Sequence, residues 1–335
     1  MIKIALDAMG GDYAPAEIVR GAREAARELE VQIMLVGHRE KIQQELAGDN
    51  AGGLLSIVHA SEVVGMDEHP VSAIRKKRDS SIVVATQLVK DGAADAVVSA
   101  GSTGAQMASS LFILGRIAGV DRPAISTLLP TANGVVALLD AGANVDCRPQ
   151  HLQQFAVMGS LYAEKILGLA NPKVGLVNIG AEETKGNELT LAAYNLLQET
   201  NINFIGNVEG RDLFFGAVSV AVCDGFVGNV ILKSAEGLAM YILGMFKQEL
   251  GKLEDILGRE KIMHILGGFQ RRMDYAEYGG APLLGVDGVS VICHGSSRAR
   301  AIKNAVRVAK EAVEQQLVRA IKVSLEKENF KEGKY

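Results

Sequence analysis

Apolar runs alternate with segments of helical periodicity along most of the chain, and this alternation constrains the fold more than any other feature. Glycine or polar turns bound the runs, which predicts strands at Ile2–Asp7, Val31–Val36, Leu54–His59, Ala96–Ser99, Ala124–Leu129, Val135–Asp140, Val174–Ile179, Asn203–Ile205, Val218–Cys223 and Val289–Cys293. The segments between them predict helices at Pro15–Leu29, Ser81–Lys90, Thr103–Ile117, Pro149–Leu167, Glu188–Gln198 and Ser297–Leu325. Such alternation predicts an α/β fold with a mostly parallel sheet and helices on both faces. Since no repeat or low-complexity linker interrupts the pattern, we expect one domain over residues 1–335.

Residues 234–276 break the alternation, because they contain no strand signal. Their apolar residues fall in two stripes at helical spacing, at Leu238, Tyr241, Ile242 and Met245 and again at Ile262, Ile265, Leu266, Phe269 and Met273. We therefore expect a helical hairpin that projects from the sheet. The stripes suit core packing or a dimer contact. Alternatively, a hairpin tip formed by Leu253, Ile256 and Leu257 touches a membrane surface.

Glycine and polar residues gather where the predicted strands end. Six such turns occur, at Asp7–Asp12, Ser99–Gly104, Asp140–Asp146, Glu183–Asn187, Asp224–Asn229 and His294–Ser297. The carboxyl ends of parallel strands meet at one edge of a sheet, which is where ligands bind in open α/β folds. Glycine lets a backbone approach a ligand closely, and exposed N–H groups form anion-binding nests. The six turns therefore predict a ligand site at that edge.

The turn at Glu183–Asn187 places a lysine, Lys185, between a predicted strand and a predicted helix. A cation near a helix N-terminus opposes the helix dipole, which favours negative charge there. A bound anion would remove this conflict, because the helix N–H groups and the ammonium could hold it together. The alternative is a solvated lysine that happens to precede a helix.

Several classes of chemistry lack their sequence signature. The chain has no GxGxxG, GxxxxGK[ST], GxSxG or HExxH motif, and Cys147, Cys223 and Cys293 are far apart in the sequence. Asp140, Asp146 and Asp224 could hold Mg²⁺, but turns and caps are the commoner use of such residues, and we predict no metal and no cofactor. The net charge of −4 and the absence of tryptophan argue against nucleic-acid binding.

Signals for secretion and for a membrane span are also missing. The first residues enter a predicted strand directly, and no apolar run approaches 18 residues. We therefore expect a cytoplasmic protein.

The remaining polar groups are a lysine, amides, hydroxyls and glycine nests, without an evident protein nucleophile. They suit a reaction in which a bound oxyanion is itself the nucleophile. Inorganic phosphate, with a second pKa near ~6–7, needs positioning more than deprotonation. Lys185 and the Asn229 side chain are the candidates for stabilising an oxyanion at an attacked carbonyl. His294 could be a general base or a structural turn residue.

Two basic clusters could dock an acidic partner, or could simply be solvated helix faces. One is the run Arg75–Arg78, and the other lies along the last predicted helix at Arg298, Arg300, Lys303, Arg307 and Lys310.

Taken together, the motifs resemble those of the bacterial phosphate acyltransferases, the acyl-ACP:phosphate transacylases of the PlsX type. The resemblance rests on Ile4–Asp12, Ser99–Ala105, Leu139–Cys147, Glu183–Glu188, Asp224–Asn229, Tyr278–Ala281 and His294–Ser297, which occur in order between Met1 and about Leu317. It implies an α/β/α sandwich related to isocitrate and isopropylmalate dehydrogenases and to phosphotransacetylases. It also implies acyl transfer from acyl carrier protein to inorganic phosphate, giving an acyl phosphate that feeds glycerol 3-phosphate acylation in phospholipid synthesis.

The resemblance further implies a homodimer with the hairpin in the interface, a peripheral membrane association, and contact with a membrane glycerol-3-phosphate acyltransferase. Lys185 and Asn229 match the catalytic positions of the family. The substrate-binding positions carried over are Asp7, Gly10, Gly11, Asp12, Ser102, Thr103, Gly104, Asn144, Asp146, Asp224, Gly225, Gly228, His294, Gly295 and Ser296.

Two other functions remain open from the sequence. An NAD-dependent β-decarboxylating dehydrogenase would share the implied fold, but it needs a carboxylate cluster that is not evident beyond Asp224. A non-catalytic scaffold that only binds acyl carrier protein would need neither Lys185 nor Asn229.

Overall fold

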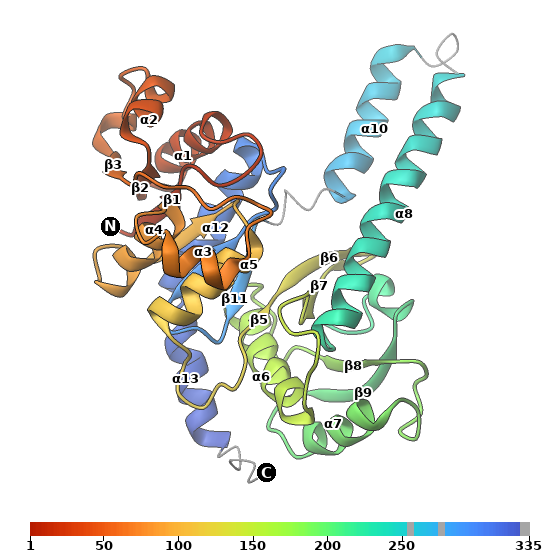
Figure 1. Cartoon of the computed structure of the whole chain (residues 1–335). Helices are drawn as coiled ribbons and strands as arrows, with labels where there is room; N and C mark the ends of the chain where they lie inside the picture. Colours follow the sequence, from red (N-terminus) through yellow and green to blue (C-terminus); the bar gives the residue numbers. More distant parts are fainter. Residues whose placement is uncertain (253–257, 274–278, 329–335) are drawn as a thin grey trace.

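Two mostly parallel sheets form the body of the protein, and a helical hairpin projects from it (Figure 1). The structure, a computed structural model, describes residues 1–252, 258–273 and 279–328. The strands of the first sheet are β1 Lys3–Asp7, β2 Gln32–Gly37, β3 Leu55–His59, β4 Ala96–Ser99, β5 Ala124–Ile125, β11 Ala281–Leu284 and β12 Val289–Ile292. The strands of the second are β6 Thr127–Thr131, β7 Gly134–Leu139, β8 Val174–Asn178, β9 Phe204–Glu209 and β10 Val220–Val222.

The first sheet has the order β3-β2-β1-β4-β12-β11-β5, and the second has the order β6-β7-β10-β8-β9. In the first sheet, only the pairings of β11 with β12 and with β5 are antiparallel. In the second, only β6 runs antiparallel to its neighbour β7. The turns after β1, β4 and β12 therefore share one edge, and those after β7, β10 and β8 share another.

The longer helices are α1 Ala16–Leu29, α2 Arg39–Leu46, α3 Pro70–Lys76, α4 Ser81–Lys90, α5 Thr103–Ser109, α6 Pro149–Lys165, α7 Glu188–Gln198, α8 Gly225–Gly251, α10 Arg259–Met273, α12 Ala299–Glu314 and α13 Leu317–Glu328. The shorter helical segments are η1 Ala51–Gly53, η2 Ser110–Leu114 and η3 Asp212–Phe215.

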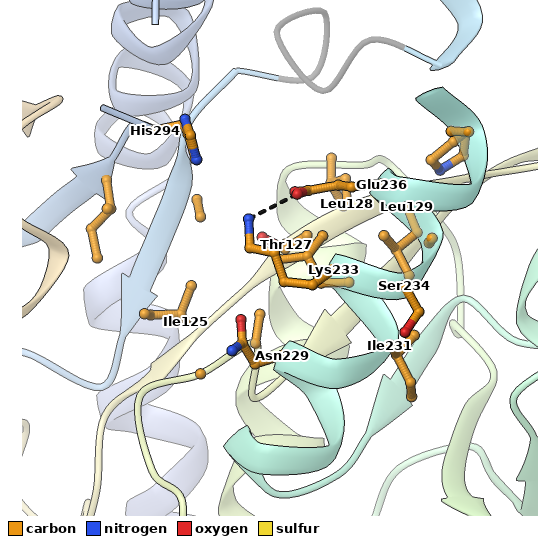
Figure 2. A pocket seen from close by; sticks show the side chains of 18 of the residues that line it. Ile125, Thr127, Leu128, Leu129, Asn229, Ile231, Lys233, Ser234, Glu236 and His294 are labelled. Atoms are coloured by element: carbon orange, nitrogen blue, oxygen red, sulfur yellow. Dashed lines mark hydrogen bonds and ion pairs between the residues drawn. The ribbon is translucent and has the colours of Figure 1, made fainter. Parts of the chain in front are cut away.

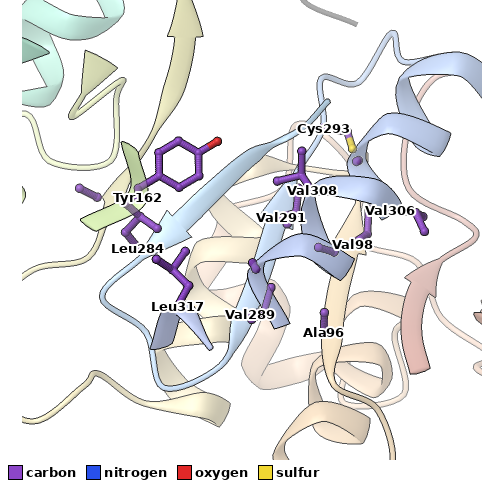
Figure 3. Packing of buried hydrophobic residues seen from close by; sticks show 14 of the residues in the cluster. Ala96, Val98, Tyr162, Leu284, Val289, Val291, Cys293, Val306, Val308 and Leu317 are labelled. Atoms are coloured by element: carbon purple, nitrogen blue, oxygen red, sulfur yellow. The ribbon is translucent and has the colours of Figure 1, made fainter. Parts of the chain in front are cut away.

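Strand residues alternate between two cores, which gives the first sheet its three layers. Ile4 and Leu6 of β1 pack in a cluster with α1 and α12, whereas Ala5 packs in a second cluster with α3, α4 and α5. The first cluster continues across the molecule. Figure 3 shows part of this cluster, with Val98, Val291 and Val308 on one side of the view and Tyr162 on the other. The predicted α/β fold class is confirmed, although its strands divide between two sheets.

Some predicted elements differ from those observed. The single strand predicted at Ala124–Leu129 is wrong, because β5 pairs with β11 while β6 pairs with β7 in the other sheet. The helix predicted at Ser297–Leu325 is two helices, since Gln316 has a φ of 50° and breaks it. The sequence pattern does not predict strand β11 or helices α2 and α3.

The hairpin consists of α8 and α10, which lie side by side and project beyond the sheets (Figure 1). Helix α8 begins at Gly225, well before the expected start at residue 234, and its only buried residues are Gly225 and Gly228 in the first turn. Within the described residues it is the one helix whose length and composition would suffice to cross a membrane. The predicted tip residues Leu253, Ile256 and Leu257 lie outside the described residues.

Candidate active site

The turns after β1, β4 and β12 pack directly against one another. The Asp12 amide donates to the Gly295 carbonyl over 2.8 Å. A Cβ atom on Gly10 would lie 2.7 Å from the Gly101 amide nitrogen, so only glycine fits there. The structure thus brings together three of the predicted turns, with Gly11 lying between Ala100 and Gly295. We call these three turns the first rim.

Asp7 holds this first rim together from inside. Its side chain is buried, and it accepts hydrogen bonds from the Ser99 hydroxyl at 2.7 Å and the Met9 amide at 3.1 Å. Burial raises the pKa of its carboxyl, against the opposing effect of these hydrogen bonds. Ser102 caps α5 by accepting from the Ala105 amide. Asp7 and Ser102 therefore shape the turns.

The turns after β7 and β10, which we call the second rim, meet in the second sheet around the buried carboxylate of Asp140. Its oxygens accept from the amides of Ile125, Gly142, Ala143 and Asn144 and from the Asn144 side chain, at 2.6–3.2 Å. Burial raises the pKa of this carboxyl too. The Gly225 amide donates to the Asn144 carbonyl over 2.7 Å, which joins the two turns.

Asp224 caps α8, because its side chain accepts from the Val227 amide at 2.8 Å. Gly228, in the first turn of α8, packs against the carbonyl oxygen of Asp140. Asp146 is exposed. Among the residues that the structure describes, no group of three His, Cys, Asp or Glu could hold a metal ion.

Lys185 lies on the turn after β8, which neighbours β10 in the same sheet. Its carbonyl accepts from the Asn178 side chain at 3.0 Å, and its own side chain is exposed. Helix α7 follows, capped by Asn187, whose Oδ1 accepts from the Thr190 amide at 2.9 Å. Lys185 therefore sits just before a helix N-terminus, as its sequence context predicts, but it does not line the large cavity described next.

A cavity of about 820 Å³ opens between the two rims. Its polar end carries Thr103 from the turn after β4, His294 from the turn after β12, and Gly142 and Asn229 from the second rim. Figure 2 shows His294 on the side opposite Asn229. The Ser296 amide donates to His294 Nδ1 at 3.2 Å. Since an amide can only donate, Nδ1 accepts and the neutral ring carries its proton on Nε2.

The rest of the cavity wall is largely apolar, and sequence reasoning did not find it. The wall residues come from β5, β6, η3, α8 and β12, and they include Ile125, Leu128, Leu129, Phe214, Ile231, Leu232, Leu238, Ile242 and Ile292. Of these, the predicted hairpin stripe supplied only Leu238 and Ile242. The other α8 residues lie N-terminal to the predicted hairpin, and the predicted strand Ala124–Leu129 spans both β5 and β6. No local sequence pattern therefore indicates that these residues share a wall. An ion pair between Lys233 and Glu236 also lines the cavity, with Nζ and Oε2 2.8 Å apart.

The predicted site residues thus fall into three groups. Thr103, Asn229 and His294 line the cavity. Most of the other predicted residues do not line it and belong to the turns that frame it, among them buried Asp7, the helix caps Ser102 and Asp224, and the glycines of the first and second rims. Lys185 and Asp146 are exposed on turns and are not part of its lining.

The chain is similar in sequence to a known protein family and to individual proteins. The model of the family described as "fatty acid synthesis protein" matches residues 2–320. A phosphate acyltransferase of Desulforamulus reducens is 83% identical over 326 residues, covering 97% of this chain and 98% of that protein. A phosphate acyltransferase of Pelotomaculum thermopropionicum is 62% identical over 327 residues, covering 97% and 95%.

Solved structures share the fold at low sequence identity. A phosphotransacetylase from Streptococcus pyogenes aligns with a TM-score of 0.63 at 18% identity, covering 92% of this chain and 94% of that one. A 4-hydroxythreonine-4-phosphate dehydrogenase from Klebsiella pneumoniae aligns with a TM-score of 0.54 at 11% identity, covering 93% and 100%. These likenesses confirm the expected three-layer α/β/α architecture.

Proposed function

The chain belongs to the phosphate acyltransferase family, whose members act in fatty acid and phospholipid synthesis, and on that premise we propose that it transfers a long-chain acyl group from acyl carrier protein to inorganic phosphate. The product is an acyl phosphate, the donor for the first acylation of glycerol 3-phosphate. The cavity is the observation that carries this proposal. It joins a small polar end to a long apolar wall, which suits a substrate with a reactive head and a hydrocarbon chain.

The proposed reaction needs no protein nucleophile. A phosphate oxygen attacks the thioester carbonyl carbon, a C–O bond forms, and the C–S bond breaks as the thiolate leaves and takes a proton from solvent. The Asn229 side chain donates to the oxyanion that develops, and Lys185 supplies positive charge from the neighbouring turn. The Nε2 proton of His294 is a second donor at the polar end.

We place the docking site of the acidic carrier at a groove of about 520 Å³ on α3, α4 and η2. Arg75 and Arg78 line this groove, and the Arg75 guanidinium lies 5.4 Å from the ring centre of exposed Phe112. Helix α3 begins at Pro70, which packs against Gly104 beside the cavity. Seven residues at ~1.5 Å each span roughly 10 Å, within reach of a flexible thioester arm.

The hairpin supports the proposal of a homodimer that associates with the cytoplasmic membrane surface, near a glycerol-3-phosphate acyltransferase. Large apolar side chains on α8 and α10 are exposed, among them Met240 at 77%, Tyr241 at 66% and Met263 at 59%. Exposed apolar surface of this kind marks contacts with proteins or lipids. A Met240→Ser, Tyr241→Ser variant should float less with anionic vesicles, and unchanged flotation would exclude this face of α8 from lipid contact.

Trapping the product tests the function directly. We expect purified protein, palmitoyl carrier protein and phosphate to yield phosphate-dependent hydroxamate when hydroxylamine is added. Asn229→Ala should lower kcat by about 10²-fold, the typical cost of losing an oxyanion donor, and Lys185→Ala should also lower it. Asn133→Ala, in the β6–β7 turn, is the matched control. Carrier binding without turnover in the wild type would instead indicate a scaffold.

A further inference from the structure

One face of α8 carries three polar side chains into the cavity. Asn229, Lys233 and Glu236 are spaced i, i+4 and i+7, which places them along a single stripe of the helix. All three line the cavity, and Figure 2 shows the Lys233 side chain extending towards its centre. Gly228 fixes the start of this helix against Asp140, so the stripe has a defined direction.

Lys233 is the only lysine or arginine among the described residues that line the cavity. Its Nζ lies 2.8 Å from Glu236 Oε2, and the two side chains are 50% and 31% exposed. A partly exposed pair of this kind contributes little to stability. Its lysine also precedes its glutamate along the helix, the less favourable order. The ammonium is therefore held in place by a partner that a stronger anion can displace.

We propose that Lys233 binds the phosphate substrate and that Glu236 competes with phosphate for its ammonium. This inference rests on the proposed function, and it assigns phosphate to Lys233 while leaving the oxyanion of the thioester to Asn229 and Lys185. A phosphate dianion carries more charge than one carboxylate and offers more acceptor oxygens, so it can replace Glu236 at the ammonium. Glu236 opposes binding in two ways, because it occupies the ammonium and because its own charge repels the dianion.

The two partners should therefore respond to substitution with opposite signs. Lys233→Met removes the cation and should raise the KM for phosphate about tenfold, with little change in the KM for the thioester. Glu236→Gln removes the competitor and should lower the KM for phosphate about threefold. A pair whose role is to stabilise α8 would instead give effects of one sign for both variants.

The experiment measures initial rates at varied phosphate for the wild type, Lys233→Met, Lys233→Arg and Glu236→Gln. A second pair on the hairpin, Lys252 with Glu249 at 2.7 Å, lies outside the cavity lining, and its variants Lys252→Met and Glu249→Gln are the matched controls. The Arg substitution should recover much of the affinity for phosphate, since it retains the charge. Control variants should match the wild type.

Titration of inorganic phosphate into each protein, followed by calorimetry, gives a readout without turnover. If the wild type makes no acyl phosphate, the proposed function fails, and these titrations still decide the role of Lys233. Unchanged phosphate affinity in Lys233→Met overturns the inference, above all if Lys185→Met weakens phosphate binding. Weaker binding in Glu236→Gln overturns the proposed competition.

Discussion

Asp7 and Asp140 occupy matching places in the two sheets, but the structures around them differ. Asp7 is the last residue of β1, and Asp140 directly follows β7. Each is buried, and burial raises the pKa of each carboxyl. The hydroxyls of Ser81 and Ser99 are among the donors to Asp7. The donors to Asp140 are four backbone amides and one side-chain amide. An aspartate at the end of an apolar run thus occurs in both rims, although the groups that donate hydrogen bonds to it differ.

In the first rim, around Asp7, turns pack against other turns, whereas in the second rim, around Asp140, a turn packs against the start of a helix. Gly10 packs against Gly101, and the Asp12 amide bonds to Gly295, so the first rim is mostly backbone. In the second rim, Gly225 and Gly228 bring the start of α8 against Asp140. The side chains that the helix directs into the cavity follow within the next turns. We infer that the buried aspartates position the site and that the exposed polar side chains carry out its chemistry.

Adding one methyl group at Gly228 should break the second rim and give the largest effect. Its Cβ would overlap the carbonyl oxygen of Asp140 and lie 3.1 Å from Cys223 Sγ, both in a close-packed region. We expect Gly228→Ala to lower the free energy of unfolding by about 3 kcal/mol, measured by urea denaturation.

The same helix provides the control, because a Cβ on Gly237 would meet nothing within 4 Å. Gly237→Ala should stabilise the protein by about 0.5–1 kcal/mol. The equivalent change in the first rim, Gly10→Ala, has a shallower overlap, 2.6 Å from Asp7 Oδ2, and should cost about 2 kcal/mol. Equal losses from Gly228→Ala and Gly237→Ala would show that α8 is not anchored at Asp140.

Replacing each aspartate by asparagine should lower the free energy of unfolding by different amounts, because the two carboxylates have different hydrogen-bond donors. At Asp140, the new NH₂ group must face an N–H donor, and we expect Asp140→Asn to cost about 2–3 kcal/mol. At Asp7, the Ser99 hydroxyl can reverse and accept, so Asp7→Asn should cost about 1 kcal/mol or less. Both are measured by urea denaturation at pH 7, and a larger loss at Asp7 would contradict the comparison.

The sequence predicted the rims better than the cavity between them. Apolar runs ending in aspartate and glycine are local signals, and the turns at Asp7, Asp140 and Asp224 lie where those signals placed them. Strand β1 was predicted to within one residue for the same reason. Asn229 and His294 were selected from such turns and do line the cavity.

The cavity wall depends on long-range packing that no local pattern encodes. Ile125 and Leu128 are close in sequence but belong to strands of different sheets, because β5 pairs with β11 and β6 with β7. Lys233 and Glu236 look like an ordinary charged helix face until Gly228 fixes the direction of α8. For Lys185 the local prediction holds but the position relative to the cavity does not follow from it. Its turn forms before a helix as predicted, while its side chain is not part of the cavity lining.

The smallest effect is a difference in pH dependence between a buried and an exposed aspartate. Burial raises the pKa of Asp7, so the folded protein keeps this proton above pH ~4, where the unfolded chain has lost it. The contribution of Asp7 to the free energy of unfolding therefore falls as pH rises. The stability of the wild type relative to Asp7→Asn should increase as pH is lowered from 7 towards 4.

For exposed Asp79, hydrogen bonds from Ser61 lower the pKa, and the wild type should lose stability relative to Asp79→Asn over the lower part of that range. Urea denaturation at several pH values measures both slopes, and slopes of the same sign would mean that the Asp7 carboxylate is solvated rather than buried in the rim.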